Sequence, residues 1–369
     1  MKRVFHIISH FDVGGAERVA LNIAKSRNPE IEYHIVEVVR ANTPFTASFV
    51  SELQNMGIAY HRAYIPQISF HYVFERLAAL TFPLWFIFIF KKYHPQVIHC
   101  HTDIPDLATY CFFRLFPRLL RGCTIVRTIH NTVLWVGMKR LGKRIEDFMQ
   151  AHRANVAISS SVQQSYQQMY GEQPPIIYNG IEPVVEQKTY DGLRPGKVNI
   201  FFAGRFEEQK GIRHLIEIIQ RLKNDSRYFF HVVGDGRLKG NLIRGIGHLD
   251  NVEVRPPVFG LSAFLHCFDY LLMPSEHEGL ALLPIEASFA GVPTIINNCL
   301  GLKDTLPDDW PLKVEENDMK GYMHLFNEVI PHANREELGR KAQDFVTVHF
   351  SLEGMQQAYE RLYLFSPHC

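Results

Sequence analysis

The sequence contains few cysteines, and they show no paired spacing. Its six cysteines are scattered over 369 residues, and no two of them form a Cys-x-x-Cys unit. A chain of this length builds a hydrophobic core without covalent cross-links, so the pattern excludes a disulfide scaffold and a zinc finger and is typical of buried thiols in a reducing compartment. The cysteines are Cys100, Cys111, Cys123, Cys267, Cys299 and Cys369.

The sequence also has little net charge, +1 at pH 7 with neutral histidines. A balanced chain gives no electrostatic reason to expect nucleic acid as a partner. The charge is unevenly divided, however: residues 1–190 hold 20 Lys and Arg against 14 Asp and Glu, and residues 191–369 hold 19 against 24. The basic first half would suit an anionic partner, although a scatter of surface charge explains the difference equally well.

No hydrophobic run is long enough to cross a membrane. The opening MKRVFHIISHFDVGG has too short an apolar run for a secretory signal, so we expect a first β-strand there and a cytoplasmic protein. The apolar run at residues 77–90 has 14 residues, whereas a membrane-spanning helix needs about 20. We interpret it as a buried core helix; the alternative is a segment that touches the inner face of an anionic cell membrane.

Short β-rich runs alternate with amphipathic segments in both halves of the chain. RVFHIIS, QVIHC and TIVRTI in the first half are matched by VNIFFAG, YFFHVVGDG and FDYLLMPS in the second. This alternation predicts an α/β fold of two Rossmann-like, doubly wound parallel-sheet domains that face each other across a cleft. We expect a first domain at residues 1–180, a hinge at 181–197, a second domain at 198–350 and a last helix at 351–369 that could fold back over the first domain.

Two candidate ligand sites follow strands of the first half. DVGGAER lies between the opening strand and a helix, where Gly14 and Gly15 leave room for a phosphate near the backbone N–H groups of the helix N-terminus. A plain strand-to-helix turn would explain the two glycines equally well. His130 ends the run TIVRTIH and could orient a hydroxyl or support a developing positive charge, or else be a structural histidine.

The loop after the first strand of the second half is basic. In FFAGRFEEQKGI the strand ends near Gly204 and Arg205, and Lys210 precedes a glycine and an amphipathic helix. Two cations in such a loop can hold a diphosphate and neutralise the charge that builds up as it leaves. We prefer this interpretation of Arg205 and Lys210 to that of a solvated surface loop. The later turn VVGDGR carries no reactive group, and we interpret it as scaffold.

The most specific pattern is LLMPSEHEGLALLPIE, in which Glu278 and Glu286 stand eight residues apart. Glu278 precedes a predicted helix and can meet a sugar hydroxyl, while Glu286 within the helix can accept hydrogen bonds from two ribose hydroxyls. The N–H groups of Leu282 and Leu283 in the first turn of that helix can face a phosphate. The alternative is a pair of glutamates that flank a surface helix.

No Asp-x-Asp occurs in the chain. Clustered carboxylates of this kind normally hold the divalent cation of a metal-dependent transferase, so we expect no metal and no other cofactor. Arg205 and Lys210 would do the electrostatic work of the cation instead.

Several motifs, in the same order, resemble the retaining glycosyltransferases of family four, which have the GT-B fold. They are GGAE near the start, His130 after a strand, YNGI at residues 178–181, GR-x(4)-KG and E-x(7)-E. The last two are highly specific in combination, and PSEHEGL is most similar to the branch that makes bacterial exopolysaccharide, capsule and lipopolysaccharide. The resemblance implies a metal-independent hexosyltransferase that retains anomeric configuration. It would move a sugar from a nucleotide-diphosphate sugar, with UDP as the first choice, to a glycan or lipid-linked acceptor.

The resemblance also implies a role for each matching residue. His130 would lie beside the donor sugar, Arg205 and Lys210 would bind the diphosphate, and Gly15 would contact the donor phosphate. Glu278 would contact the sugar, and Glu286 would bind the ribose. The implied catalytic residues are His130, Arg205, Lys210 and Glu278, and Gly14, Gly204, Leu282 and Leu283 complete the donor-binding set.

Two other functions stay open at this point. Non-hydrolysing nucleotide-sugar epimerases share the architecture, but they lack the two coupled motifs. An inactive sugar-nucleotide-binding subunit of a polysaccharide assembly would have lost some of the candidate residues, which are all present. One stretch departs from the family pattern: NNCLGLKDTLPDDW keeps only Gly301 of a second Gly-rich segment, so the sequence does not specify the sugar pocket.

Overall fold

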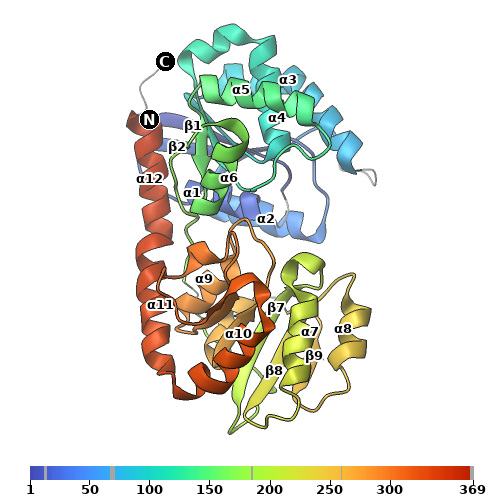
Figure 1. The fold of residues 1–369 in the computed structure, drawn as a ribbon. Helices are drawn as coiled ribbons and strands as arrows, with labels where there is room; N and C mark the ends of the chain where they lie inside the picture. The colour runs from blue at the N-terminus through green and yellow to red at the C-terminus, as the bar shows by residue number, and fades with distance from the viewer. Residues whose placement is uncertain (12–14, 67–70, 184–185, 259, 366–369) are drawn as a thin grey trace. The chain divides into compact units, whose positions relative to one another are not determined.

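The computed structural model describes residues 1–11, 15–66, 71–183, 186–258 and 260–365. The chain divides into two compact units: unit 1 is Met1–Gly180 with Leu352–Cys369, and unit 2 is Ile181–Ser351. Each unit has one six-stranded sheet with helices on both faces (Figure 1). The predicted α/β class with two doubly wound, Rossmann-like sheets is confirmed.

The sheet of unit 1 has the strand order β3-β2-β1-β4-β5-β6, and every neighbouring pair is parallel. Its strands are mostly buried apolar residues because helices cover both faces of the sheet. The order reverses between β1 and β4, which is where open sheets of this kind bind ligands. The strands are β1 (Lys2–Ile8), β2 (Ile31–Glu37), β3 (Ala59–His61), β4 (Val97–His101), β5 (Thr124–Ile129) and β6 (Asn155–Ala157). The helices are α1 (Gly15–Ala24), α2 (Pro44–Asn55), α3 (His71–Tyr93), α4 (Asp103–Leu115), α5 (Lys139–Ala151), α6 (Ser160–Tyr170) and α12 (Leu352–Phe365).

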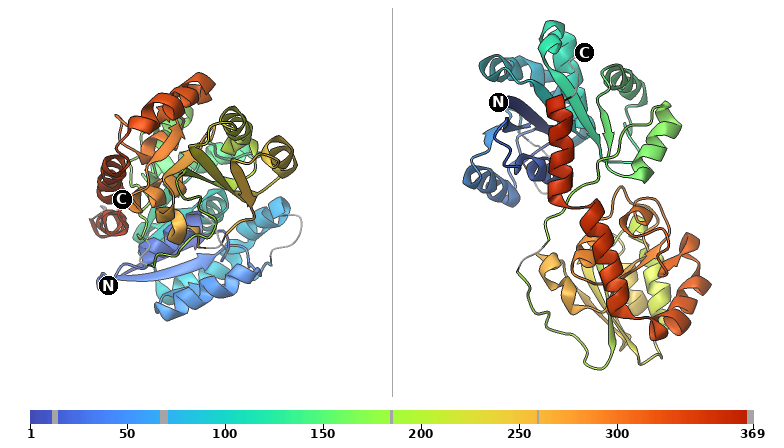
Figure 2. Two further views of the ribbon diagram at one scale, coloured as in Figure 1. Left: turned by 90° about the horizontal axis from the view of Figure 1, so that it is seen from below. Right: turned by 90° about the vertical axis from the view of Figure 1, so that its left-hand side faces the viewer.

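The final helix, α12, packs on unit 1 although it follows unit 2 in the sequence (Figure 2). Tyr359 and Tyr363 are buried, and their hydroxyl groups lie 2.8 Å from Thr128 Oγ1 and 2.7 Å from His99 Nδ1. Lys2 Nζ donates a hydrogen bond to the carbonyl oxygen of Tyr363 at 2.6 Å. These contacts attach α12 to β5 and to β1 and β4, the two strands that flank the reversal point.

Unit 2 has the strand order β12-β11-β10-β7-β8-β9, which is the order of unit 1 listed from the opposite edge. The reversal falls between β7 and β10. The strands are β7 (Val198–Arg205), β8 (Tyr228–Asp235), β9 (Val252–Arg255), β10 (Tyr270–Met273), β11 (Thr294–Asn297) and β12 (Lys313–Val314). The helices are α7 (Ile212–Arg221), α8 (Lys239–Ile246), α9 (Leu282–Phe289), α10 (Met319–His324) and α11 (Arg335–His349).

Residues 181–197, the predicted hinge, contain no helix or strand in their described part. Ile181 forms an isolated parallel bridge with Ser351. Farther along, Tyr190 is buried, and its ring contacts the ring of Phe268 edge-on at a centroid distance of 4.8 Å. The segment is therefore packed against unit 2 at both points.

The apolar run at residues 77–90 lies within α3 and has two different sides. Phe82, Phe86 and Phe90 are buried in unit 1, whereas the other side exposes four large apolar residues. These are Leu77, Leu80, Leu84 and Phe88, which are 45, 57, 64 and 72% exposed. No helix in the described part of the chain is long and apolar enough to cross a membrane. The run is thus helical and only half-buried: one side packs in the core of unit 1, and the other side is an exposed apolar stripe.

Candidate active site

In unit 2 the two strongest motifs meet at the carboxyl edge of the sheet. Lys210 lies in a short 3-10 turn after β7, and Glu278 lies in the loop after β10, the neighbouring strand. Lys210 Nζ donates a hydrogen bond to Glu278 Oε1 at 2.7 Å. The Glu278 side chain is 8% exposed and that of Lys210 is 20% exposed. The Lys210 side chain is therefore partly exposed at this edge, whereas the Glu278 side chain is buried.

Hydrogen bonds hold the two loops together. The N–H of Glu276 donates to the carbonyl oxygen of Gln209 at 2.8 Å, and Gln209 Nε2 donates to the carbonyl oxygen of His277 at 3.1 Å. Gly211 has a φ of +66°, and a Cβ atom on it would lie 1.8 Å from the carbonyl oxygen of Pro274. Only glycine fits there. Lys210 is thus followed directly by Gly211, the residue that allows the loop after β7 to come this close to Pro274.

A second layer of polar residues supports the Glu278 loop, and the sequence analysis missed it. The side-chain amides of Asn297 and Asn317 donate to backbone carbonyl groups of residues 274–275, at 2.9 and 3.1 Å. Gly301 has a φ of +79°, and a Cβ atom on it would lie 2.2 Å from the carbonyl oxygen of Glu278. In the sequence, only the positions of these two residues could have indicated this role: Asn297 ends β11, and Asn317 follows β12 at the same sheet edge.

Arg205 is the last residue of β7 and is exposed. Among the residues that the structure describes, its guanidinium group has no ion-pair partner. A Cβ atom on Gly204 would lie 3.7 Å from Cδ of Lys210, so the strand end and the lysine side chain are close to each other. The carboxyl edge of the sheet in unit 2 therefore carries two cations. Lys210 is paired with the buried Glu278 carboxylate, and Arg205 is available to an anion.

Glu286 lies on α9 and is largely buried. Burial raises the pKa of its carboxyl group, and a hydrogen bond from Ser262 partly offsets that effect. Glu286, Ser262 and His266 border a small cavity of about 50 Å³ within unit 2. Leu282 and Leu283 are the first residues of α9, so their N–H groups have no acceptor within the helix. The helix offers anion-binding N–H groups at its start and a carboxylate one turn later.

In unit 1, Gly14 lies outside the described residues. Gly15 is the first residue of α1 and is exposed, and no atom of the described residues would lie within 4 Å of a Cβ atom on it. His130 directly follows β5. Burial lowers its pKa to about 3, so the ring is neutral at pH 7.

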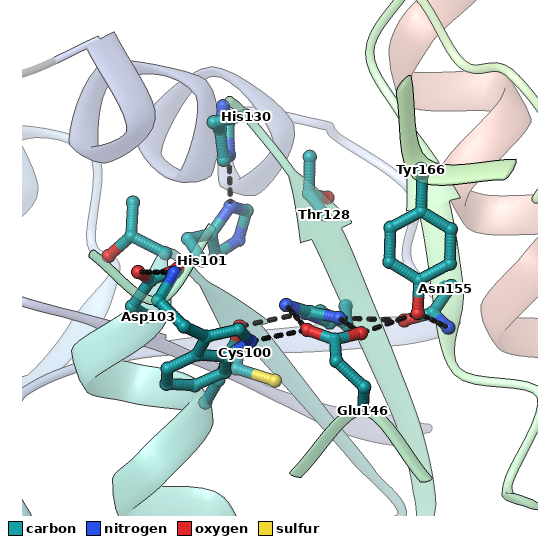
Figure 3. A network of polar contacts seen from close by, with 12 residues as sticks. Cys100, His101, Asp103, Thr128, His130, Glu146, Asn155 and Tyr166 are labelled. Atoms are coloured by element: carbon teal, nitrogen blue, oxygen red, sulfur yellow. Dashed lines mark hydrogen bonds and ion pairs between the residues drawn. The ribbon is translucent and has the colours of Figure 1, made fainter. Parts of the chain in front are cut away.

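Further histidines, which the sequence analysis did not single out, lie near His130, and Figure 3 shows one of them, His101. His101 Nδ1 is 3.2 Å from His130 Nε2, and His6 Nδ1 is 3.0 Å from His101 Nε2. His6, His99 and His101 have the composition of a metal site. Both nitrogens of His99 contact hydroxyl groups at 2.7 Å, however, and His6 and His101 are bonded to each other. A hydrogen-bonded cluster fits these residues better than a metal site. The sequence pattern that could have indicated them is histidine at alternate positions of β4, His99 and His101, and at the position of β1 that pairs with His99, which is His6.

Models of known protein families match both units. Residues 13–184 match Glycosyltransferase Family 4, and residues 197–330 match Glycosyl transferases group 1. The chain belongs to the family 4 glycosyltransferases. The family resemblance inferred from the motifs is thereby confirmed.

Individual relatives agree with this assignment. Capsular polysaccharide biosynthesis glycosyltransferase CapH of Staphylococcus aureus is 24% identical over 84% of this glycosyltransferase and 83% of the relative. A glycosyltransferase structure from Rickettsia africae has a TM-score of 0.77 at 17% identity and covers 98% of this chain and 97% of that one. HepE of Anabaena, solved with UDP and glucose, has a TM-score of 0.76 at 14% identity, and the match covers 99% of this chain and 100% of that one. This glycosyltransferase therefore has the GT-B fold.

A buried ion cluster braces β5 of this glycosyltransferase close to His130 (Figure 3). Arg127 donates to Asp106 at 2.7 Å and to both carboxylate oxygens of Glu146 at 2.7 and 2.8 Å. Trp135 Nε1 also donates to Glu146, at 2.6 Å. Removing one partner from such a cluster leaves an uncompensated buried charge. The cluster thus holds β5 in place, and His130 directly follows that strand.

Proposed function

We propose that this glycosyltransferase moves a sugar from a nucleotide-diphosphate sugar, a UDP-sugar, to a glycan or lipid-linked acceptor with retention of anomeric configuration, in cell-surface polysaccharide synthesis. The observation that carries the proposal is the Lys210–Glu278 pair at the carboxyl edge of unit 2, with Arg205 exposed on the adjoining strand end. The complex of HepE with UDP and glucose supports the donor class, and the role of CapH in capsular polysaccharide biosynthesis supports the pathway.

The two cations would stabilise the leaving group. In the transfer, an acceptor hydroxyl oxygen bonds to the anomeric carbon while the bond from that carbon to the β-phosphate oxygen breaks. The electron pair of the broken bond stays on the nucleoside diphosphate, which takes up the hydroxyl proton. Arg205 can bind two phosphate oxygens as a fork, and Lys210 can neutralise the oxygen that gains charge. Fixed cations of this kind lower a barrier most where charge develops in the transition state. We therefore assign Arg205 and Lys210 to the diphosphate and propose that no metal ion is required.

The two glutamates would hold the donor on either side of the diphosphate. Glu278 keeps Lys210 at the sheet edge through one carboxylate oxygen, which leaves the other to accept a bond from a sugar hydroxyl. Glu286 would accept hydrogen bonds from the ribose hydroxyls. The N–H groups of Leu282, Leu283 and Gly15 would add donors for phosphate oxygens. In unit 1, which we propose as the acceptor side, His130 would contact the donor sugar.

We also propose that unit 1 contacts the inner face of the cell membrane through α3. Its apolar stripe, defined above as Leu77, Leu80, Leu84 and Phe88, is followed by exposed Lys91 and Lys92. Apolar side chains enter the interfacial layer, and each Lys or Arg near anionic headgroups adds about 1 kcal/mol. A lipid-linked acceptor at that face would then lie near the enzyme.

A panel of UDP-, GDP- and ADP-sugars tests the proposal, first by thermal shift and then by transfer to a lipid-linked acceptor. A ligand that binds only the folded state raises stability by mass action, so a UDP-sugar should raise the melting temperature most. Arg205→Ala should abolish this effect, whereas Arg221→Ala, an exposed arginine paired with Glu217 on α7, should not. An epimerase would convert the donor in the absence of acceptor, and an inactive subunit would bind the donor without turnover. Either result would reject the proposed function.

A further inference from the structure

His6, His101 and His130 form a row of hydrogen-bonded imidazole rings in unit 1, which we call the histidine row. The row begins at His6 in the middle of β1, passes through His101 at the end of β4, and ends at His130 after β5. The two nitrogen–nitrogen distances are 3.0 and 3.2 Å. Figure 3 shows the outer part of the row, with one nitrogen of His130 directed to His101 and the other directed away from it.

All three rings of the histidine row are neutral at pH 7. Burial lowers the pKa of His6 to about 3, and burial together with the neighbouring histidines lowers the pKa of His101 well below its usual value. His130 is neutral for the reason given above. A neutral imidazole has one N–H donor and one bare nitrogen that accepts. Since both nitrogens of His101 are in hydrogen bonds, one must donate and the other must accept.

The row can therefore run in only two directions. Directed outward, His6 donates to His101, His101 donates to His130, and His6 Nε2 is a bare nitrogen. Directed inward, both bonds reverse, and His6 Nε2 carries a proton. His6 Nε2 is buried and has no hydrogen-bond partner among the residues that the structure describes. His99, the neighbouring ring on β4, offers it no acceptor because both of its nitrogens are engaged with hydroxyl groups.

The lone nitrogen of His6 decides between the two directions. Among backbone groups, a buried N–H without an acceptor is rarer than a buried carbonyl oxygen that lacks a donor, and we apply the same order to the imidazole nitrogen. We infer that the histidine row runs outward, so that His101 Nδ1–H donates to His130 Nε2, and His130 carries its proton on Nδ1. His130 then presents an N–H donor to the ligand, and it has no basic nitrogen there.

This assignment makes His6 and His101 positioning residues for His130. They fix which nitrogen of His130 holds the proton and how its ring is oriented, in the way that a hydrogen-bonded partner fixes a histidine tautomer in other sites. The identity of the ligand that receives the N–H rests on the proposed function, whereas the direction of the row does not. A donor at this point would hold a sugar hydroxyl or ring oxygen and would not remove a proton from the acceptor.

Nitrogen NMR of the full chain with ¹⁵N-labelled histidine tests the direction without any turnover. Protonated and bare ring nitrogens have well-separated ¹⁵N shifts, and the signals are assigned by comparing variants that each lack one of the three histidines. We expect Nδ1–H and a bare Nε2 for His130 and for His101, and the same for His6. An Nε2–H form of His130, a doubly protonated ring in the row at pH 7, or shifts of His6 and His101 on addition of zinc would overturn the inference.

Matched variants of His101 test its positioning role. His101→Asn can place an amide N–H where Nδ1 was, whereas His101→Leu removes the donor. We expect His101→Leu to lower kcat by about tenfold, the equivalent of one hydrogen bond, with UDP affinity unchanged, and His101→Asn to recover most of the loss. His99→Asn is the control, because His99 is as buried but lies outside the row; its kcat should stay within about twofold. Equal losses in kcat for all three variants would refute the positioning role. If no donor is turned over although the NMR result is as expected, the proposed function fails and the direction of the row stands.

Discussion

Replacing Lys210 by methionine separates the structural role of this residue from its role in the reaction. Lys210→Met keeps most of the aliphatic stem and removes only the ammonium group. Two effects should follow: the buried Glu278 carboxylate loses its ion-pair partner at 2.7 Å, and the leaving diphosphate loses a cation. The first effect lowers stability, and the second lowers turnover.

The structure sets the size of each effect. Exposed ion pairs contribute about 0–1 kcal/mol, and removing one partner of a fully buried pair costs about 3–5 kcal/mol. With Glu278 8% and Lys210 20% exposed, the loss should lie between these limits, at about 2–3 kcal/mol. For a unit of this size that corresponds to a fall in melting temperature of roughly 4–12 °C. Loss of a group that stabilises the transition state should lower kcat by about 10²- to 10³-fold.

A double variant distinguishes the two losses. In Lys210→Met/Glu278→Gln neither charge is left unpaired, so the melting temperature should recover by at least half, while kcat should stay low. Thermal unfolding and initial rates with a defined donor and acceptor measure both quantities, and Glu278→Gln alone is the reference. If Lys210→Met stays folded and keeps its turnover, or if the double variant regains kcat, the assignment of Lys210 to the leaving group is wrong.

Four further predictions concern other parts of the molecule. Glu286→Gln should raise the donor KM by about 10- to 150-fold with little change in kcat, because ribose is held equally in ground and transition states; a fall in kcat alone would contradict this. Activity should persist in excess EDTA, and complete loss restored by magnesium or manganese would show a metal requirement. Leu84→Glu with Phe88→Glu should abolish co-sedimentation with anionic vesicles at low salt, and failure of the wild type to sediment would make α3 a core helix only. The folded-state pKa values of His6 and His130 lie near 3, below the unfolded value of 6.5, so the unfolded state binds more protons between these limits. Stability should therefore fall as the pH is lowered from 6.5, with a slope that approaches about 1.4 kcal/mol per pH unit for each ring, and a flat unfolding free energy between pH 7 and 5 would contradict the neutral state of the two rings.

The fold class could be predicted from the sequence because its signals are local. Each strand is a short β-rich run, and each is followed by a segment long enough for a crossover helix, so the pattern predicts parallel sheets without any knowledge of packing. Arg205, Lys210 and Glu278 follow β-rich runs in the sequence, which likewise indicated the carboxyl edge of the second sheet, and that is where the strand end and the two loops lie.

Contacts between distant segments could not be predicted in this way. Lys210 and Glu278 are 68 residues apart, and nothing local indicates that they form an ion pair. Asn297 and Asn317 support the Glu278 loop but belong to no motif. The histidine row depends on the register of β1 against β4 and of β4 against β5, which the sequence does not specify. For α3, a run that is apolar on all sides has no period that distinguishes its exposed stripe from its buried side.

We propose above all that this glycosyltransferase moves a sugar from a UDP-sugar to an acceptor with retention of configuration. The most direct test is ¹H NMR of the reaction with the UDP-sugar that the thermal-shift panel selects and a lipid-linked acceptor, in excess chelator, followed from its first minutes. We predict release of UDP in step with formation of a glycoside whose anomeric configuration is that of the donor. A glycoside of the opposite configuration, sugar released only to water, or an epimerised donor would contradict the account.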